Sequence, residues 1–227
     1  MRKWIRWIAG IVMIVCAGSI VNYFMSYSQV EKQLEQAQEI VETNELATIQ
    51  QQNTNIIGWL SLENSRLNNP VLQANDNEFY LTHNYLDEKS RGGSIFMDFR
   101  NDGLNDRHTI FYGHVLRNGT MFGELAKFNE QSYADEHPVF YYETNEKRFV
   151  LQVFAAYETN TEDYYIETQF TDETFAQFLT QIKGKSAITM PINVTTQNKI
   201  VTFSTCTTSQ NDHERFVVHA KVVEQEN

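Results

Sequence analysis

The longest apolar run of the chain is one uninterrupted block near its N-terminus. Residues 7–27 (WIAGIVMIVCAGSIVNYFMSY) contain no Asp, Glu, Lys or Arg. As a helix that rises about 1.5 Å per residue, this block can cross a hydrocarbon core of about 30 Å. The pattern therefore predicts one membrane-spanning helix, which is flanked as such helices usually are by interfacial aromatic residues, here Trp4, Trp7, Tyr23 and Tyr27.

The next block, residues 29–52, is rich in Gln and Glu and lacks Gly and Pro. Its apolar residues recur near helical spacing, which is typical of an amphipathic helix: Val30, Leu34, Ala37, Val41 and Leu46. We interpret residues 28–55 as a stalk helix or as a helix packed on the domain that follows. A coiled coil that binds a partner is the alternative.

From Ile56 onward the chain consists of short apolar segments rich in Val, Ile, Phe and Tyr and bounded by Asn, Asp or Gly, a pattern typical of β-strands. The predicted strands are Gly58–Leu62, Pro70–Leu72, Gly93–Phe96, Thr109–Tyr112, Pro138–Glu143, Arg148–Tyr157, Lys199–Thr205 and Phe216–Glu224. Two helical stretches interrupt them, Asn77–His83 and Thr171–Lys183. About eight strands with few helices predict a mainly β domain, residues 56–227, folded as a closed or nearly closed barrel.

The second of these helices carries its own start signal. Thr171 and Thr174 are spaced to cap its first turn. Its apolar residues form one stripe, which we expect to pack on the core: Phe175, Phe178, Leu179 and Ile182.

Charge gives the chain an orientation. The 227 residues include 18 Lys and Arg against 29 Asp and Glu, a net charge of −11. This balance argues against a nucleic-acid partner, which requires a basic face. Arg2, Lys3 and Arg6 precede the apolar block, and the first acidic residue is Glu31. By the positive-inside rule residues 1–6 form a cytoplasmic tip and the rest lies outside, where the charge balance is −14.

Two other interpretations of the N-terminal block stay open. Ala17-Gly18-Ser19 resembles the cleavage site of a signal peptide, although the apolar region exceeds the roughly 7–15 residues usual for one. Lipidation at Cys16 is the second, although Val15 rather than a small residue precedes it. We favour an uncleaved anchor over residues 7–27, which makes the chain a single-pass protein of the cell membrane with an extracellular domain.

The two cysteines lie in different parts of this topology. Cys16 is inside the apolar block, whereas Cys206 ends the predicted strand KIVTFSTC, so they cannot pair within one chain. The exported domain therefore carries one lone thiol. A buried, inert thiol is one interpretation. Cys206 is instead followed by a polar loop, and reactive groups are commonly displayed there, which makes it a candidate nucleophile.

A thiol nucleophile needs a proton donor and a group that stabilises the oxyanion. His114 follows the predicted strand Thr109–Tyr112 through one glycine and so projects from a strand end. Arg215 opens the strand after the Cys206 loop, and if this loop is a hairpin, Arg215 returns beside Cys206. His219 lies in an apolar run, and four histidines in polar contexts are expected at the surface: His83, His108, His137 and His213.

These residues carry a resemblance to the sortase family. The segment TFSTC, residues 202–206, resembles the sortase signature Thr-Leu-x-Thr-Cys, and Arg215 with FVV follows as the family's arginine strand does. The segments GGSIFMDFRN, TIFYGHVLRNGTMFGEL and RFVVHAKVV are similar to class B sortases in particular. Phe203 stands where leucine is usual, and we expect packing to absorb this change. Thr207 and Thr208 stand where some relatives have acidic residues.

The resemblance implies a sortase-like closed β-barrel and a calcium-independent cysteine transpeptidase with no cofactor or metal. In such an enzyme Cys206 attacks the threonine carbonyl of a surface protein's C-terminal sorting motif, NPxTN-like or LPxTG-like. Arg215 stabilises the oxyanion and His114 protonates the leaving amine. An amino group of a cell-wall precursor, lipid II or peptidoglycan, then resolves the thioacyl intermediate. The resemblance also implies six substrate-binding residues: Asn77, Leu81, Thr161, Tyr165, Ile166 and Ser204.

Other interpretations stay open. A pilin polymerase of the same fold would use a pilin lysine as the acceptor, and a cysteine hydrolase would use water. A non-catalytic surface-interaction module has no need of the Cys, His and Arg together. Ordinary core packing is the alternative for Leu81 and Ile166. The sequence has no phosphate-binding glycine loop and no His-x-x-x-His or Cys-x-x-Cys spacing, so it predicts neither a nucleotide site nor a metal site.

Overall fold

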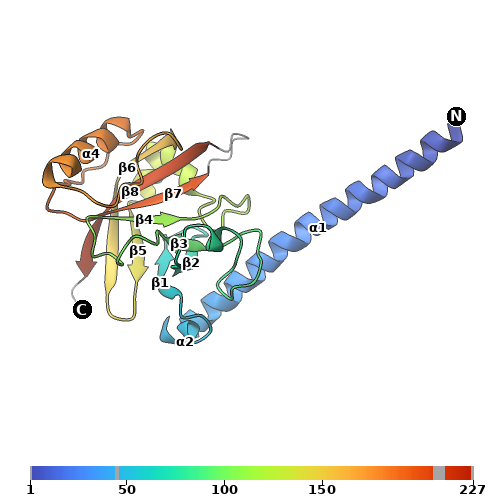
Figure 1. Ribbon diagram of the computed structural model, residues 1–227, viewed down its shortest axis with the longest axis horizontal. Coiled ribbons are helices and arrows are strands. Elements are labelled where there is room, and N and C mark those ends of the chain that lie inside the picture. The colour runs from blue at the N-terminus through green and yellow to red at the C-terminus, as the bar shows by residue number, and fades with distance from the viewer. Residues whose placement is uncertain (1, 44–45, 207–212, 226–227) are drawn as a thin grey trace.

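In the computed structural model, which describes residues 2–43, 46–206 and 213–225, eight strands close into a barrel (Figure 1). Around the barrel they follow the order β1-β2-β3-β4-β7-β8-β6-β5, and β5 pairs back onto β1. The pairs β2–β3 and β4–β7 are parallel. The strands are β1 (Ile56–Ser61), β2 (Asn68–Leu72), β3 (Ile95–Met97), β4 (His108–Tyr112), β5 (Val139–Glu143), β6 (Arg148–Asn160), β7 (Ile200–Cys206) and β8 (Glu214–Gln225).

Each predicted strand overlaps one of these eight, so the predicted mainly β barrel is confirmed. Successive residues of a strand point to opposite faces, and β7 shows the two faces clearly. Phe203 points into the barrel, where its ring centroid lies 4.3 Å from that of Phe140 and 5.6 Å from that of Phe111. The aromatic residue at the usual leucine position is therefore absorbed by core packing, as expected.

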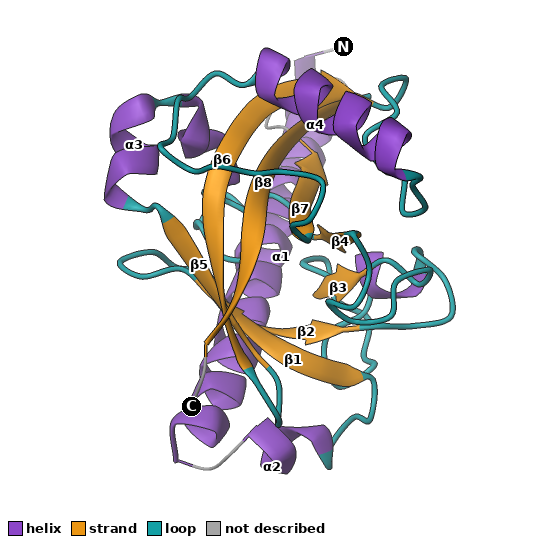
Figure 2. Cartoon of the chain, turned by 90° about the vertical axis from the view of Figure 1, so that its left-hand side faces the viewer, coloured by secondary structure: helices purple, strands orange, loops and turns teal. Residues whose placement is uncertain are grey.

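The outward face of β7 and β8 is covered by α4 (Asp172–Lys185) (Figure 2). The predicted cap is present, because the Thr171 side chain accepts from the Thr174 backbone N–H and the Thr174 hydroxyl accepts from the Thr171 N–H. The predicted apolar stripe of α4 is buried against this face. A second apolar layer thus lies outside the barrel.

The chain enters the barrel from α1 (Arg2–Thr43), which joins the predicted membrane segment and the predicted amphipathic segment in one continuous helix. Its first half projects away from the barrel (Figure 1). Twelve of the fifteen exposed large apolar side chains in the described residues lie between Trp4 and Met25. Val30, Leu34 and Ala37 are buried against the barrel side of the molecule. A short helix, α2 (Leu46–Gln50), follows before β1.

The predicted helix Asn77–His83 is wrong in extent, because only η1 (Phe79–Leu81) forms there, as a single 3-10 turn. The Asp76 carboxylate accepts the backbone N–H groups of Glu78 and Phe79, both at 2.8 Å. These bonds cap the first turn of a helix. The helix does not continue because the Tyr80 carbonyl accepts from the distant Ser94 N–H. Two further short elements were not predicted: η2 (Leu125–Asn129) and α3 (Gln131–Glu136).

Candidate active site

Three strand ends meet at one edge of the barrel and bring the predicted catalytic residues together. The end of β4 runs parallel to β7, with Tyr112 opposite Ser204. The Gly113 N–H donates to the Ser204 carbonyl at 3.3 Å, and His114 follows directly. Across the antiparallel pair β7–β8, Cys206 lies opposite Arg215, which confirms the pairing expected from a hairpin.

The structure describes the backbone of Cys206 as the last residue of β7, whereas its side chain lies outside the described part. The loop residues 207–212, which include Thr207 and Thr208, also lie outside it. The register nevertheless places the Cys206 and Arg215 backbones side by side. Directly opposed residues of antiparallel strands have Cβ atoms about 4.5–5.5 Å apart, a distance that a guanidinium can bridge.

A groove of about 340 Å³ opens at this edge of the barrel. Six of its lining residues were predicted as site residues, which are Asn77, Leu81, His114, Tyr165, Ser204 and Arg215. Four were not predicted, and they are Phe96, Tyr112, Gly113 and Thr205. The groove is therefore apolar on part of its wall and carries hydroxyl and amide groups on the rest, which suits an extended peptide.

His114 is held by a backbone carbonyl. Its Nε2 lies 2.8 Å from the Leu81 carbonyl oxygen, which can only accept, so Nε2 carries the hydrogen of this bond. Gly93 has a left-handed φ of +55°, and a Cβ there would meet the same carbonyl oxygen at 2.7 Å. A glycine at this position therefore lets the carbonyl stay where it orients His114.

Two of the predicted substrate-binding residues form part of the polar groove wall. The Tyr165 hydroxyl and the Ser204 hydroxyl lie 2.9 Å apart. Two other predicted substrate-binding residues, Thr161 and Ile166, do not line the groove. The Thr161 N–H donates to the His213 carbonyl, and the Ile166 carbonyl accepts from Arg100 at 2.9 Å.

A buried carboxylate, Asp98, supports the groove from behind, and sequence reasoning missed it. It accepts two hydrogen bonds from the Arg100 guanidinium, at 2.8 and 2.7 Å. It also accepts from the Tyr112 hydroxyl and the Asn77 amide, both at 3.0 Å. Burial alone would raise the pKa of Asp98, but the hydrogen bonds from Arg100 and Tyr112 outweigh it and lower that pKa. Asp98 thus stays charged and fixes two groove residues.

A chain of buried polar groups lies on the same outward face of β7, beneath α4. His108 Nε2 is 2.5 Å from the Thr202 hydroxyl, which is 2.7 Å from His219 Nδ1. His219 Nε2 in turn lies 3.2 Å from the Tyr157 hydroxyl. The surface position expected for His108 is therefore wrong, because β4 begins with this residue and places its ring under Phe178 of α4.

The expected surface position of His137 is also wrong, since its ring stacks on Tyr133 and is largely buried. Burial lowers the pKa of His108 to about 4 and lowers that of His219 well below its usual value. Both buried histidines on β4 and β8 are therefore neutral at neutral pH. Within the described ranges no group of three or more His, Cys, Asp or Glu residues could hold a metal ion.

The comparisons with known proteins agree with this geometry. Residues 60–223 match the family model described as the sortase domain. Sortase B of Listeria monocytogenes is 40% identical over 184 residues, which cover 79% of this chain and 74% of that protein.

Two solved structures are also similar to the chain. The Staphylococcus aureus sortase B–substrate complex has a TM-score of 0.83 at 36% identity and covers 89% of this chain and 100% of that one. A sortase B complexed with triglycine has a TM-score of 0.82 at 35% identity and covers 88% and 100%. The chain therefore belongs to the sortase family, within its sortase B group, and is a cysteine transpeptidase.

Proposed function

We propose that this sortase B cuts a C-terminal sorting motif after its threonine and joins the acyl part to an amino group of a cell-wall precursor. The observation that carries the proposal is the convergence of three strand ends on one groove. Cys206 ends β7, Arg215 lies opposite it on β8, and His114 follows β4. A nucleophile, a cation and a proton carrier are the groups that acyl transfer through a thioester requires.

In the proposed first half-reaction the Cys206 thiolate attacks the carbonyl carbon of the threonine. A C–S bond forms, and the Arg215 guanidinium stabilises the negative charge that develops on the carbonyl oxygen. The C–N bond then breaks, and protonated His114 gives its Nδ1 proton to the leaving amine, because Nε2 is engaged with the Leu81 carbonyl.

In the second half-reaction an acceptor amine attacks the thioester carbon. The amine loses a proton to His114, the C–S bond breaks, and the thiolate of Cys206 is regenerated. Water attacking in place of the amine would give hydrolysis, so the outcome depends on which nucleophile reaches the thioester first.

The groove supports a peptide substrate of the sorting-motif type, NPxTN-like or LPxTG-like. Asn77 and Ser204 offer polar contacts and Leu81, which is 36% exposed, offers an apolar one. We propose Asn77, Leu81, Thr161, Tyr165, Ile166 and Ser204 as the substrate-binding residues. The relatives solved with a substrate and with triglycine support a sorting peptide as donor and a glycine amine as acceptor.

We also propose that residues 7–27 anchor the enzyme in the cell membrane, with residues 1–6 in the cytoplasm and the catalytic domain, residues 56–227, outside. Among the described residues one helix is long and apolar enough to cross a membrane, and none of its apolar window is buried in the molecule. The amphipathic part of α1 then connects the membrane directly to the barrel.

The test uses the full chain in lipid nanodiscs with fluorogenic NPxTN-type and LPxTG-type peptides. Each reaction contains triglycine, a lysine side-chain amine or no acceptor, and Cys206→Ala is the control. We expect cleavage of one motif class that depends on Cys206 and yields a triglycine-linked product. A lysine-linked product would indicate a pilin-type acceptor, and release to water alone would indicate a hydrolase. No Cys206-dependent cleavage of either class would contradict the proposed substrate.

A further inference from the structure

Two arginines near the exposed half of α1 differ from the others in the domain. The chain has seven arginines after residue 28. Arg215 lines the groove, and four others form ion pairs with carboxylates: Arg66, Arg100, Arg107 and Arg148. Arg91 and Arg117 are exposed, and neither has a carboxylate partner among the residues that the structure describes.

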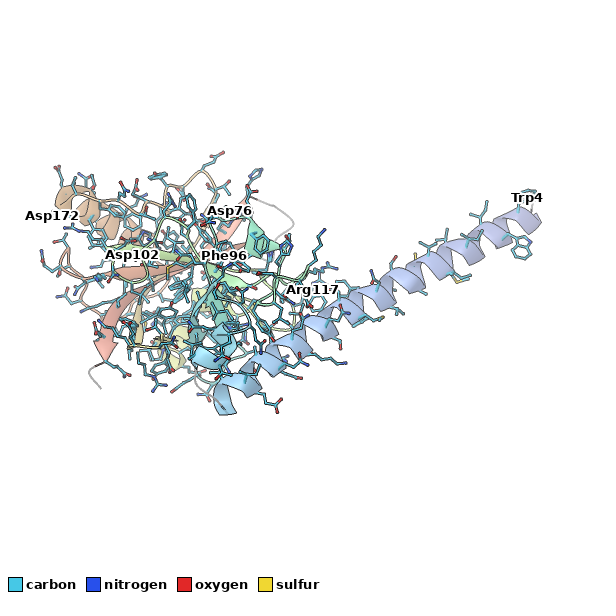
Figure 3. The ribbon with its side chains drawn as sticks, turned by 60° about the horizontal axis from the view of Figure 1, so that its bottom comes forward. Trp4, Asp76, Phe96, Asp102, Arg117 and Asp172 are labelled. Atoms are coloured by element: carbon cyan, nitrogen blue, oxygen red, sulfur yellow. The ribbon has the colours of Figure 1, made fainter. Side chains whose placement is uncertain are left out.

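Both arginines lie against the aromatic end of the apolar segment. The Arg91 guanidinium carbon is 4.8 Å from the centroid of the Tyr23 ring and 6.0 Å from that of Tyr27. The Tyr23 hydroxyl interacts with the Arg117 side chain. Figure 3 shows Arg117 at the point where α1 leaves the barrel. Cation–π contact with the two rings holds Arg91, and the interaction with the Tyr23 hydroxyl holds Arg117, at one level along the helix.

That level corresponds to the lipid headgroups if α1 spans the membrane, because Tyr and Trp rings at the end of a spanning segment lie in the headgroup region. The neighbouring carboxylates lie further along α1. Glu31 of α1 pairs with Arg66. Glu88 accepts from Gln33 of α1, and Gln33 lies six residues and about 9 Å past Tyr27. The membrane-facing rim of an acidic domain is therefore locally cationic.

We propose that Arg91 and Arg117 form a basic collar around α1 that binds the phosphate groups of anionic phospholipids at the outer membrane surface. This inference rests on the membrane anchor proposed above. The planar guanidinium group binds phosphate oxygens in a bidentate manner. One basic residue near an anionic bilayer strengthens association by about fivefold.

The basic collar also connects the membrane to the active site. Arg117 lies three residues after His114, in a loop closed by the bridge between Val115 and Met121. Arg91 lies two residues before Gly93, which abuts the carbonyl that orients His114. Bound headgroups therefore restrain both loops beside the groove and set the height of the groove above the membrane.

The test measures hydrogen exchange in the full chain, inserted in nanodiscs of phosphatidylcholine alone or of phosphatidylcholine with phosphatidylglycerol. We expect phosphatidylglycerol to slow amide exchange in residues 88–93 and 114–121, by about fivefold for each arginine. The double variant Arg91→Gln/Arg117→Gln should lose this slowing. Arg148→Gln, which removes an exposed arginine of β6, is the matched control and should keep it.

Two results would overturn the basic collar. Exchange in these loops that is the same in both lipids would do so, as would slowing that survives in the double variant. If the chain stays in the discs after a high-pH wash but shows no lipid-dependent slowing, the collar is wrong and the anchor stands. If the wash releases the chain, the anchor and the collar are both wrong.

Discussion

The adjacent strands β4, β7 and β8 carry two polar regions on one outward face, and the surroundings of these regions are opposite. At one end His108, Thr202 and His219 lie beneath α4 and are fully buried. A few residues further along the same strands, Ser204 and Arg215 border the open groove beside His114. Similar side chains on, or directly after, the same three strands therefore serve different purposes.

The buried region and the groove differ in whether each donor and acceptor of their histidines already has a partner. His108 Nδ1 lies 2.6 Å from the Glu167 carbonyl, which can only accept, so Nε2 of this neutral ring must accept from Thr202. The Thr202 oxygen then accepts from His219 Nδ1, and His219 Nε2 accepts from Tyr157. Every group in the buried chain is satisfied, whereas His114 has one nitrogen left for a substrate proton.

The largest expected effect separates the two kinds of histidine. His114→Ala should lower kcat/KM by about 10²–10⁴-fold, because it removes the proton donor, and should leave the melting temperature nearly unchanged. His219→Phe should do the reverse, because Thr202 and Tyr157 each lose a buried partner, at about 2–3 kcal/mol in the free energy of unfolding. Peptide cleavage assays and thermal denaturation on both variants measure this.

The assays of His219→Phe are to be run well below its own melting temperature, so that unfolding does not imitate a catalytic defect. A fully stable His219→Phe protein with little activity would show that the buried chain takes part in the reaction. A strongly destabilised His114→Ala protein would show that the groove histidine is structural.

Asp98→Asn is expected to have the largest effect on stability among single changes near the groove. It leaves the Arg100 guanidinium facing a neutral group, and breaking a buried pair costs about 3–5 kcal/mol. Because about a third of the Arg100 side chain is exposed, we expect about 3 kcal/mol in chemical denaturation. Peptide KM should also rise, because the amide keeps only one of the two oxygens that accept from Arg100, Asn77 and Tyr112.

The matched control is Asp163→Asn, which removes the charge from a more exposed pair with Lys185. This change should cost less than about 1 kcal/mol. Equal costs for the two variants would mean that the buried position of Asp98 adds nothing to the stability of the domain.

The strands of this fold could be predicted because each presents one buried apolar face, and KIVTFSTC of β7 is a clear case. Their pairing could not be predicted, since β4 and β7 are neighbours in space but about 90 residues apart in the chain. The helix expected around Phe79 shrank to one turn because the Tyr80 carbonyl accepts from the Ser94 N–H at 2.9 Å, fourteen residues along the chain. Such a long-range hydrogen bond depends on the folded arrangement and cannot be predicted from the local sequence.

The catalytic candidates were predictable because His114, Cys206 and Arg215 flank strand ends, where chemistry is usually displayed. Asp98 was missed because an acidic residue after a short strand looks like an ordinary turn. His108 was placed at the surface because the charged residues Asp106 and Arg107 precede it. Only the packing of α4 over β4 shows that its ring is buried.

Acid should weaken the buried histidine chain before it affects Asp98. The pKa of His108 is about 4 in the folded protein and about 6.5 when unfolded, so between these values the unfolded chain binds the extra proton. The free energy of unfolding should therefore fall as pH drops below about 6.5, by about 2 kcal/mol between pH 7 and pH 5 from His108 alone. Asp98, whose pKa is lowered, should lose its contribution only below about pH 4.

Urea denaturation at intervals from pH 7.5 to pH 4 measures this pH dependence of the free energy of unfolding, with the wild type compared with His219→Phe. The variant retains His108 but lacks the second buried histidine, so its stability should depend less steeply on pH. If the free energy of unfolding of the wild type does not change between pH 7 and pH 5, then His108 and His219 are not buried in the neutral form.

The smallest expected effect tests the direction of the hydrogen bonds in the buried chain. Tyr157→Phe removes only the last donor and leaves His219 Nε2 without a partner, which should cost about 1 kcal/mol or about 2–4 °C in melting temperature. Thr202→Val removes the central hydroxyl and leaves one nitrogen of each histidine unpaired, so it should cost about twice as much.

Nitrogen-15 NMR of the wild-type rings gives the independent readout. Because the Glu167 carbonyl must accept, His108 and His219 should both be neutral with hydrogen on Nδ1, and Tyr157→Phe should leave both tautomers in place. An Nε2–H tautomer at either ring would contradict the hydrogen-bond directions that we assign to this row of buried groups. With the hydrogen of His219 on Nε2, Tyr157→Phe would remove an acceptor instead of a donor. The hydrogen-bond directions on which we base the contrast between the buried groups and the open groove would then be wrong.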